Sequence, residues 1–283
     1  MRICKTIGLS AAVFLLLGSV LTGCSQVTAE DLMRDAQNNL NNAKSVDGDF
    51  AMEMNMGIDE GALSMGIGIN ADMDMEVLND PEMYHMNGTI GIDLMDMTLD
   101  MEIYGREADD KMETYVNAGE GWQKSVVEED AAGGESVVAL GDSLLDASNC
   151  ELQRDTESVN GQEAYVISAR LEGDDFVEVW DELQDAFSAA GGLTDDISVD
   201  LSGLRADVTY HIYKDTKLPA GISLVVEGGE DAVLTEVEGI GILLRELSFA
   251  INFDEYNQVN EIEIPAEALQ APEEETGADG FAL

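Results

Sequence analysis

Apolar and polar residues alternate along most of the chain between residues 50 and 103. A period of two places successive side chains on opposite faces of a β-strand, and it is the most constraining pattern in this sequence. Turn residues at Asp59–Gly61 and Asn79–Pro81 separate the runs. Two of the runs, GIGINADMDMEV and GTIGIDLMDMTLDMEI, also resemble each other. The pattern therefore predicts neighbouring strands of one antiparallel meander.

The stretch DLMDMTLDMEIY, residues 93–104, mixes methionine with acid almost residue by residue. The apolar phase before it is even and ends at Leu94, whereas the phase after it is odd from Met95 onward. We interpret this slip, with no turn residue between the two phases, as a β-bulge in one strand. Alternation then puts Met97, Leu99 and Met101 on one face, and Asp96, Asp100 and Glu102 on the other. Thioethers and carboxylates of one strand therefore cannot bind the same ion.

Two segments have helical spacing. In the first, Thr28 is placed to cap a helix of about four turns, with Asp31 at the acceptor position of a capping box. Its apolar residues fall on one face, namely Leu32, Met33, Ala36, Leu40 and Ala43. The second segment, residues 174–192, has Phe176, Val179, Trp180, Leu183 and Phe187 on one face and ends at Gly191–Gly192.

The last third of the chain returns to strands. Asn160–Gly161 predicts a tight hairpin, and a closing hairpin is expected over residues 249–265. No regular βαβ alternation is present, which argues against a parallel sheet. The expected fold class is α+β: a large, curved, antiparallel sheet, unclosed like half a barrel, with a few helices packed on its concave face.

The N-terminus predicts export. Arg2 and Lys5 precede an apolar run, residues 7–21, that is short for a membrane span and fits a secretory signal. The run ends in LTGC, residues 21–24, which resembles the lipobox of bacterial lipoproteins. That resemblance implies lipidation at Cys24 and a protein anchored in the bilayer at the outer face of the cytoplasmic membrane, within the cell envelope. We expect a signal peptide over 1–23, one β-rich domain over 24–268 and a loose acidic tail over 269–283.

The net charge and the absence of known catalytic motifs limit the classes of function that we expect. Thirteen basic residues stand against 59 acidic ones, for a net charge of −46, which disfavours nucleic acid as a partner. Nucleophile-elbow, zinc-protease, dithiol and phosphate-loop motifs are absent, so we expect no enzyme, no cofactor and no designed metal site. Once Cys4 leaves with the signal and Cys24 is lipidated, Cys150 has no partner for an intramolecular disulfide and is expected to act as a small apolar residue.

The whole region from the first helix to IEIPAEAL resembles the superfamily of LolA/LolB-like and LppX/LprG-like lipoprotein and lipid carriers. Three stretches carry the resemblance: ETYVNAGEGWQKS with Trp122 and Lys124, YHIYKDTKLPAGISLVV with Leu218 and Pro219, and FAINFDEYNQVNEIEIP. The resemblance implies an unclosed β-barrel whose concave face is covered by helices and sometimes encloses a cavity for acyl chains.

Twelve of the fourteen methionines lie between Met52 and Met112. Methionine repacks easily around apolar ligands of varied shape. We therefore expect a lipid or other hydrophobic ligand to lie on a face lined by Met54, Met56, Met73, Met75, Met97, Met101, Phe176 and Trp180. Two alternatives stay open: a structural or interaction lipoprotein whose core is filled by its own helices, and a methionine-based copper(I) binder.

Overall fold

The computed structural model describes residues 27–60, 63–109, 111–128, 150–172, 204–228, 233–237 and 240–272. These residues form one helix, two short 3-10 helices and an antiparallel sheet. The helices are α1 (Ala29–Asn41), η1 (Asp93–Met95) and η3 (Ala268–Gln270). The strands are β1 (Ser45–Glu60), β2 (Leu63–Asn79), β3 (Glu82–Ile92), β4 (Met97–Glu107), β5 (Lys111–Asn117), β6 (Trp122–Glu128), β7 (Glu151–Leu152), β8 (Glu157–Val159), β9 (Gln162–Glu172), β10 (Arg205–Tyr213), β11 (Pro219–Glu227), β12 (Val233–Val237) and β13 (Ile240–Tyr256).

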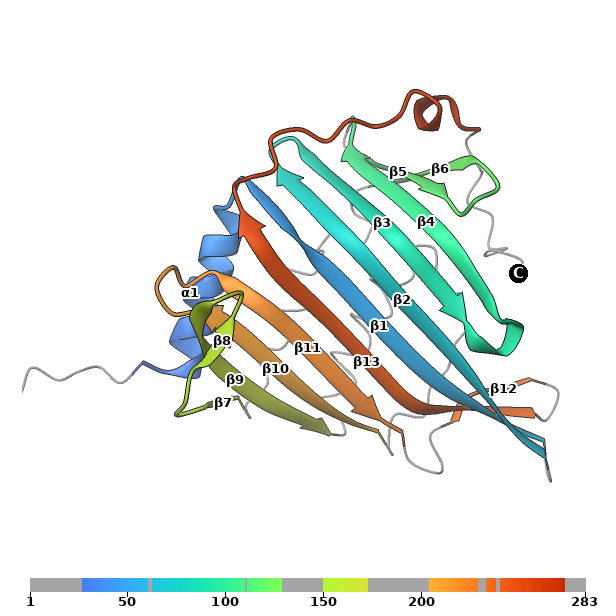
Figure 1. Ribbon diagram of the computed structural model, residues 1–283, viewed down its shortest axis with the longest axis horizontal. Helices are drawn as coiled ribbons and strands as arrows, with labels where there is room; N and C mark the ends of the chain where they lie inside the picture. The colour runs from blue at the N-terminus through green and yellow to red at the C-terminus, as the bar shows by residue number, and fades with distance from the viewer. Residues whose placement is uncertain are drawn as a thin grey trace, which may run out of the picture.

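The described strands belong to one open sheet (Figure 1). Its order is β6-β5-β4-β3-β2-β1-β13-β11-β10-β9-β7, with β12 beside β13 and β8 beside β9. The first six strands are a meander, as the alternation predicts. The long last strand β13 then inserts between β1 and β11 and joins this meander to the C-terminal strands. The sheet is antiparallel and unclosed, in agreement with the expected fold class.

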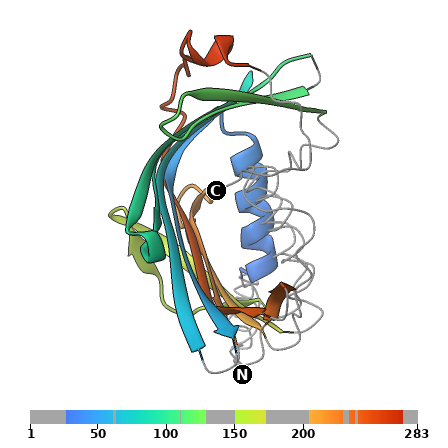
Figure 2. The ribbon, with the colours of Figure 1, turned by 90° about the vertical axis from the view of Figure 1, so that its right-hand side faces the viewer.

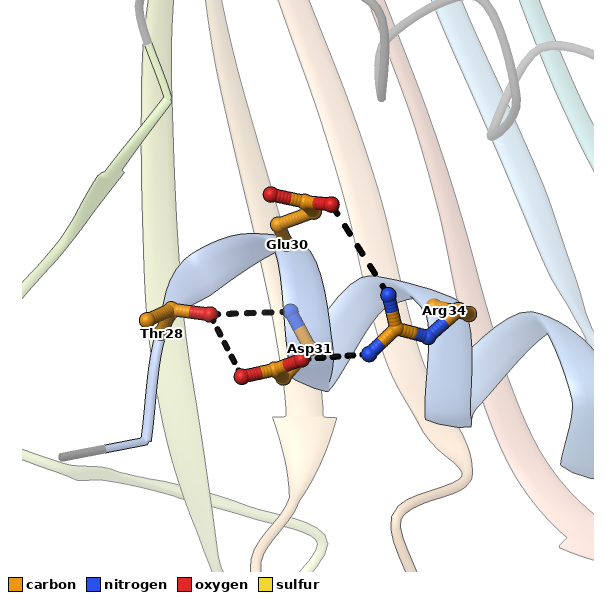
Figure 3. Close-up of polar contacts among 4 residues, drawn as sticks. All are labelled: Thr28, Glu30, Asp31 and Arg34. Carbon is orange, nitrogen blue, oxygen red and sulfur yellow. Dashed lines mark hydrogen bonds and ion pairs between the residues drawn. The ribbon is translucent and has the colours of Figure 1, made fainter. Parts of the chain in front are cut away.

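Helix α1 begins at the expected cap. The backbone N–H of Asp31 donates to Thr28 Oγ1 at 3.1 Å, and the Thr28 hydroxyl donates back to the Asp31 carboxylate at 2.8 Å (Figure 3). Arg34 pairs with both Asp31 and Glu30 one turn earlier. The two acids lie in the first turn, where their negative charges interact favourably with the positive end of the helix dipole. These contacts fix where the chain leaves its N-terminal segment and enters the domain.

Helix α1 packs across the C-terminal half of the sheet, and Figure 2 shows it on the side toward which the sheet curves. We call this side of the sheet the inner face. The helix buries Leu32, Met33, Ala36 and Leu40 against inner-face residues of the sheet. In this core the neighbours from β9, β10, β11 and β13 are Val, Leu, Ile, Ala, Phe and Tyr. The second predicted helix, over 174–192, lies outside the described residues.

The expected β-bulge near Leu94 is wrong. The strand ends at Ile92, η1 reverses the chain, and β4 starts at Met97, directly opposite Ile92. Asp96 takes the left-handed conformation, with φ 49° and ψ 42°, which Asp tolerates better than most non-glycine residues. The phase slip therefore marks a four-residue turn. From Met97 onward the predicted alternation holds, because Asp100 is exposed while Met97 and Leu99 are half-buried.

The expected closing hairpin over 249–265 is also wrong, because residues 257–265 form no strand. The end of β13 already has a partner on each side, since Tyr256 pairs with Val46 of β1 and Asn252 with Gly221 of β11. A following strand has no free edge there. The chain instead crosses the outer face of the meander as a segment we call the strap, residues 257–272.

The strap covers a second, smaller core on the outer face. Ile262 and Ala268 are buried there with Leu78, Tyr104 and Tyr115. At its end, η3 lies against β5 and β6, and the backbone N–H of Lys124 donates to Pro272 at 3.3 Å. The tight turn at Asn160–Gly161 is present as predicted, with both residues at positive φ. Within the described ranges, no helix combines the length and the apolar character needed to cross a bilayer.

Candidate ligand-binding face

Register brings the predicted methionines to one face. Residues paired directly across antiparallel strands point to the same side. Met54 and Met56 of β1 pair with Ile69 and Ile67 of β2, and Ile69 pairs in turn with Ile92 of β3, which pairs with Met97 of β4. The same register carries Met73, Met75 and Met101 to this side. All six lie on the inner face, the side on which α1 packs.

We define the methionine face as the inner-face methionines of β1 to β4. Its members are Met52, Met54, Met56, Met65, Met73, Met75, Met86, Met97 and Met101. Three of these members were not predicted, although each continues the alternation of its own strand: Met52, Met65 and Met86. Met86 is the most informative of these, because it lies directly opposite Met75. Phe176 and Trp180, which were expected to cover this face, lie outside the described residues.

Burial changes sharply along this continuous inner face. On β9, β10, β11 and β13, residues such as Ile167, Val208, Leu224 and Phe249 are less than a tenth exposed. On the methionine face only Met73 and Met75 are that deeply buried, at 3% and 7% exposure. The others are half-buried, except Met65, which is 47% exposed. The apolar surface therefore continues well beyond the part of the sheet that α1 seals.

Acids stand on the opposite side of the same strands. Asp72, Asp74 and Asp100 are exposed on the outer face, between the methionines in sequence. This separation confirms that thioethers and carboxylates of one strand point apart. Among the residues that the structure describes, no three His, Cys, Asp or Glu side chains are grouped so that they could hold a metal ion.

Two polar networks on the outer face were not predicted. In the first, the Glu113 carboxylate accepts hydrogen bonds from Lys124 at 2.6 Å, from Arg106 at 2.7 Å and from the Tyr115 hydroxyl at 2.8 Å. Burial alone raises the pKa of Glu113, but these three hydrogen bonds outweigh it and lower the pKa to about 2. Both cations also lie within 6 Å of the Tyr115 ring centroid. The scarcity of basic residues in this chain was the signal that could have singled out Arg106 and Lys124.

The second network surrounds His85. Its ring stacks on Tyr104 with centroids 4.3 Å apart, and its Nδ1 lies 3.3 Å from Glu76. Tyr104 donates to Glu102 at 2.9 Å. Burial and this hydrogen bond raise the pKa of Tyr104 to about 12. Both networks lie at the meander end of the outer face, next to the strap and on the opposite side of the sheet from the methionine face.

Cys150 behaves as expected for a small apolar residue. Its side chain is half-buried against the main core, and burial raises the pKa of its thiol. A raised pKa keeps the thiol protonated and poorly nucleophilic at neutral pH.

A family model now places the chain among known sequences. The model, described as a family of unknown function (DUF6612), matches residues 28–273, from the cap of α1 to the end of the strap. The chain belongs to this family. A comparison with curated proteins returned no match.

Solved structures similar to the chain include LolA-type proteins. One is a DUF1329 family protein from Desulfovibrio piger ATCC 29098, with 12% identity, 80% of this chain and 91% of that chain covered, and a TM-score of 0.20. An outer membrane lipoprotein-sorting protein domain from Vibrio parahaemolyticus has 10% identity, coverage of 81% and 93%, and a TM-score of 0.23. A LolA superfamily protein from Nitrosomonas europaea has 10% identity, coverage of 83% and 96%, and a TM-score of 0.24. The LolA-like group that the sequence resembles recurs among these structures.

Proposed function

We propose that this protein is a lipid-anchored, extracytoplasmic lipoprotein that holds an apolar ligand, such as a lipid or the acyl chain of a lipoprotein, against its methionine face. Three parts of the chain have separate roles. The lipidated Cys24 holds the protein at the membrane, α1 seals the C-terminal half of the inner face, and the methionine face receives the ligand. No catalytic step is part of this proposal.

The observation that supports it best is the change in burial along the inner face. Both halves of this face are apolar, and the main contacts of α1 are with β10 and β11 of the C-terminal half. Residues Met54, Met56, Met97 and Met101 remain half-buried on the other half. Contact with an acyl chain would remove this apolar surface from water, which is worth roughly 25 cal/mol per Å².

The residue types also suit such a ligand. A site for hydrocarbon chains needs few hydrogen-bonding groups, and the side chains of the methionine face are all thioethers. Methionine adapts its three side-chain torsions to ligands of different shape. The acidic outer face keeps the protein soluble around this apolar surface and disfavours anionic lipid headgroups at that side.

Native mass spectrometry of the protein purified from its own cell envelope tests the proposal. The protein is released by cutting the chain between the anchor and α1, so that the anchor's own acyl chains are removed. The proposal expects an additional mass of a lipid or acylated species that organic solvent extracts. If the released protein consistently carries no added mass and takes up none from lipid vesicles, the face is filled from within and the interaction-protein alternative is the better account.

A further inference from the structure

Gly88 is an inner-face position of the meander that carries no side chain. Gly88 of β3 lies between β2 and β4, with Met73 opposite it on one side and Met101 opposite it on the other. A Cβ at Gly88 would collide with the backbone of Asp72, so only glycine fits. Met73 and Met101 therefore flank Gly88 on the same face with no β3 side chain between them, a place that we call the gap. Their Cα atoms are about 10 Å apart, twice the spacing of neighbouring strands.

Two more methionines border this gap. Met86 is two residues before Gly88 on β3, so its side chain points to the same face. Met75 lies directly opposite Met86 on β2. Four thioethers from three adjacent strands thus surround a single glycine. A second glycine of this face, Gly105, contrasts with it, because the ring of Tyr84 occupies the space where its side chain would be.

Composition alone does not account for the cluster. The inner-face residues of β9, β10, β11 and β13 serve the same packing role in the same sheet, and those four strands contain no methionine. Aliphatic residues evidently suffice to fill the inner face there. Around Gly88 the chain uses the one apolar side chain that also carries a soft ligand atom.

We propose that Met73, Met86 and Met101, with Met75 beside them, form a thioether site for copper(I) centred over Gly88. This site goes beyond binding of an apolar ligand and gives the copper alternative a specific place. Thioether sulfur is a soft ligand that selects Cu(I) over hard cations such as Ca²⁺ and Mg²⁺. It has no proton to lose, so binding does not compete with protons as it does at cysteine or histidine sites.

The surrounding charge favours a cation. Asp72, Asp74 and Asp100 lie on the outer face of the strands that carry Met73, Met75 and Met101. They cannot reach the gap, but their negative potential, together with the net charge of −46, lowers the energy of a monovalent cation near the sheet. Met86 and Met101 are half-buried, whereas Met73 is almost fully buried. The proposed site would therefore combine two thioethers near the surface with one in the core.

Anaerobic titration with Cu(I), buffered by a competing chromogenic chelator, tests the proposal, with Ag(I) as a redox-inert second probe. We expect one equivalent to bind with sulfur-only coordination in X-ray absorption. Replacing the three ligands by leucine (Met73→Leu, Met86→Leu, Met101→Leu) should weaken binding by more than about 100-fold. Leucine conserves volume, so the protein should remain folded.

A matched variant distinguishes a specific Cu(I) site over Gly88 from a general affinity of the methionine face for Cu(I). Met52→Leu, Met54→Leu and Met97→Leu change the same number of methionines on the same face, away from Gly88, and should leave Cu(I) affinity unchanged. Equal losses in both triple variants, retained binding in the first, or no binding by the natural protein would each overturn the proposal. Cu(I) binding and fatty-acid-probe binding are measured separately on the natural protein, so the copper site and the apolar-ligand function succeed or fail independently.

Discussion

The carboxylate of Glu113 on β5 lies 2.6 Å from the ammonium group of Lys124 on β6, and Arg106 of β4 contacts the same carboxylate. This arrangement joins three strands at the meander end of the sheet. The side chains of Glu113 and Lys124 are only 15% and 18% exposed. At this depth, removal of one partner leaves the others poorly solvated, unlike an exposed surface pair.

Glu113→Gln should destabilise the protein by about 2 kcal/mol at pH 7, because Arg106 and Lys124 lose their shared carboxylate. The pKa of Glu113 is lowered in the folded state, so its contribution is complete above the unfolded value of 4.5 and is lost as pH falls toward about 2. Urea unfolding should therefore show a gap between the two proteins that is full at pH 7 and narrower at pH 3. The exposed pair Arg170–Asp207 provides the control: Asp207→Asn should leave the free energy of unfolding almost unchanged.

Asp96 and Asp100 offer a test of the turn that replaced the predicted bulge. Asp96 has a left-handed backbone, whereas Asp100 lies in the middle of β4. Asp96→Ile should cost about 1–2 kcal/mol, because a β-branched side chain is strained at positive φ. Asp100→Ile should be neutral or stabilising, since Ile favours strands. A similar cost at both positions would argue against the left-handed turn.

The strap should stabilise one end of the sheet through Ile262, which is buried against Leu78, Tyr104 and Tyr115. Ile262→Ala should cost about 2–4 kcal/mol. Amide hydrogen exchange should show the loss of protection concentrated in β4, β5 and β6, with β9 to β11 little changed. Ile264→Ala, at a half-buried position of the same segment, should cost less. Uniform loss of protection across the sheet would mean that the strap is not a local clamp.

Cys24 is predicted to be the lipid attachment site. Cys24→Ala should release the protein from the membrane fraction or leave it uncleaved, because two acyl chains provide the anchor. Cys150→Ala should stay membrane-bound and is the control for loss of a cysteine. Membrane association of Cys24→Ala with an unchanged mature N-terminus would contradict the prediction.

Local pattern was enough to predict much of this fold. Period-two alternation identified β1, β2 and β4, the Asn160–Gly161 turn defined the β8–β9 hairpin, and Thr28 marked the start of α1. These features depend on residues close in sequence. The inner-face residues could be assigned for the same reason, because successive side chains of a strand point to opposite faces of the sheet.

Features that depend on distant pairing were missed. Residues 258–264, QVNEIEI, alternate like a strand, but the neighbours of β13 on both sides leave them no edge to join. The phase slip at Leu94 fits either a bulge or a turn until Ile92 and Met97 are seen to pair. The grouping of Met73, Met86 and Met101 around Gly88 likewise requires the register of three strands, which no single stretch of sequence contains.

Binding of a fatty-acid-like probe shows whether the methionine face holds an apolar ligand. The chain has two tryptophans, and Trp122 packs in the outer-face core, so Trp122→Phe leaves Trp180 as the only indole reporter. We predict saturable binding that shifts the Trp180 fluorescence. Probe binding, followed by probe fluorescence, should be blocked when Met97→Phe or Met75→Phe adds bulk to this face. Met83→Phe, on the outer face of β3, should leave binding intact. No saturable binding, or binding indifferent to bulk at Met75 and Met97, would contradict the account.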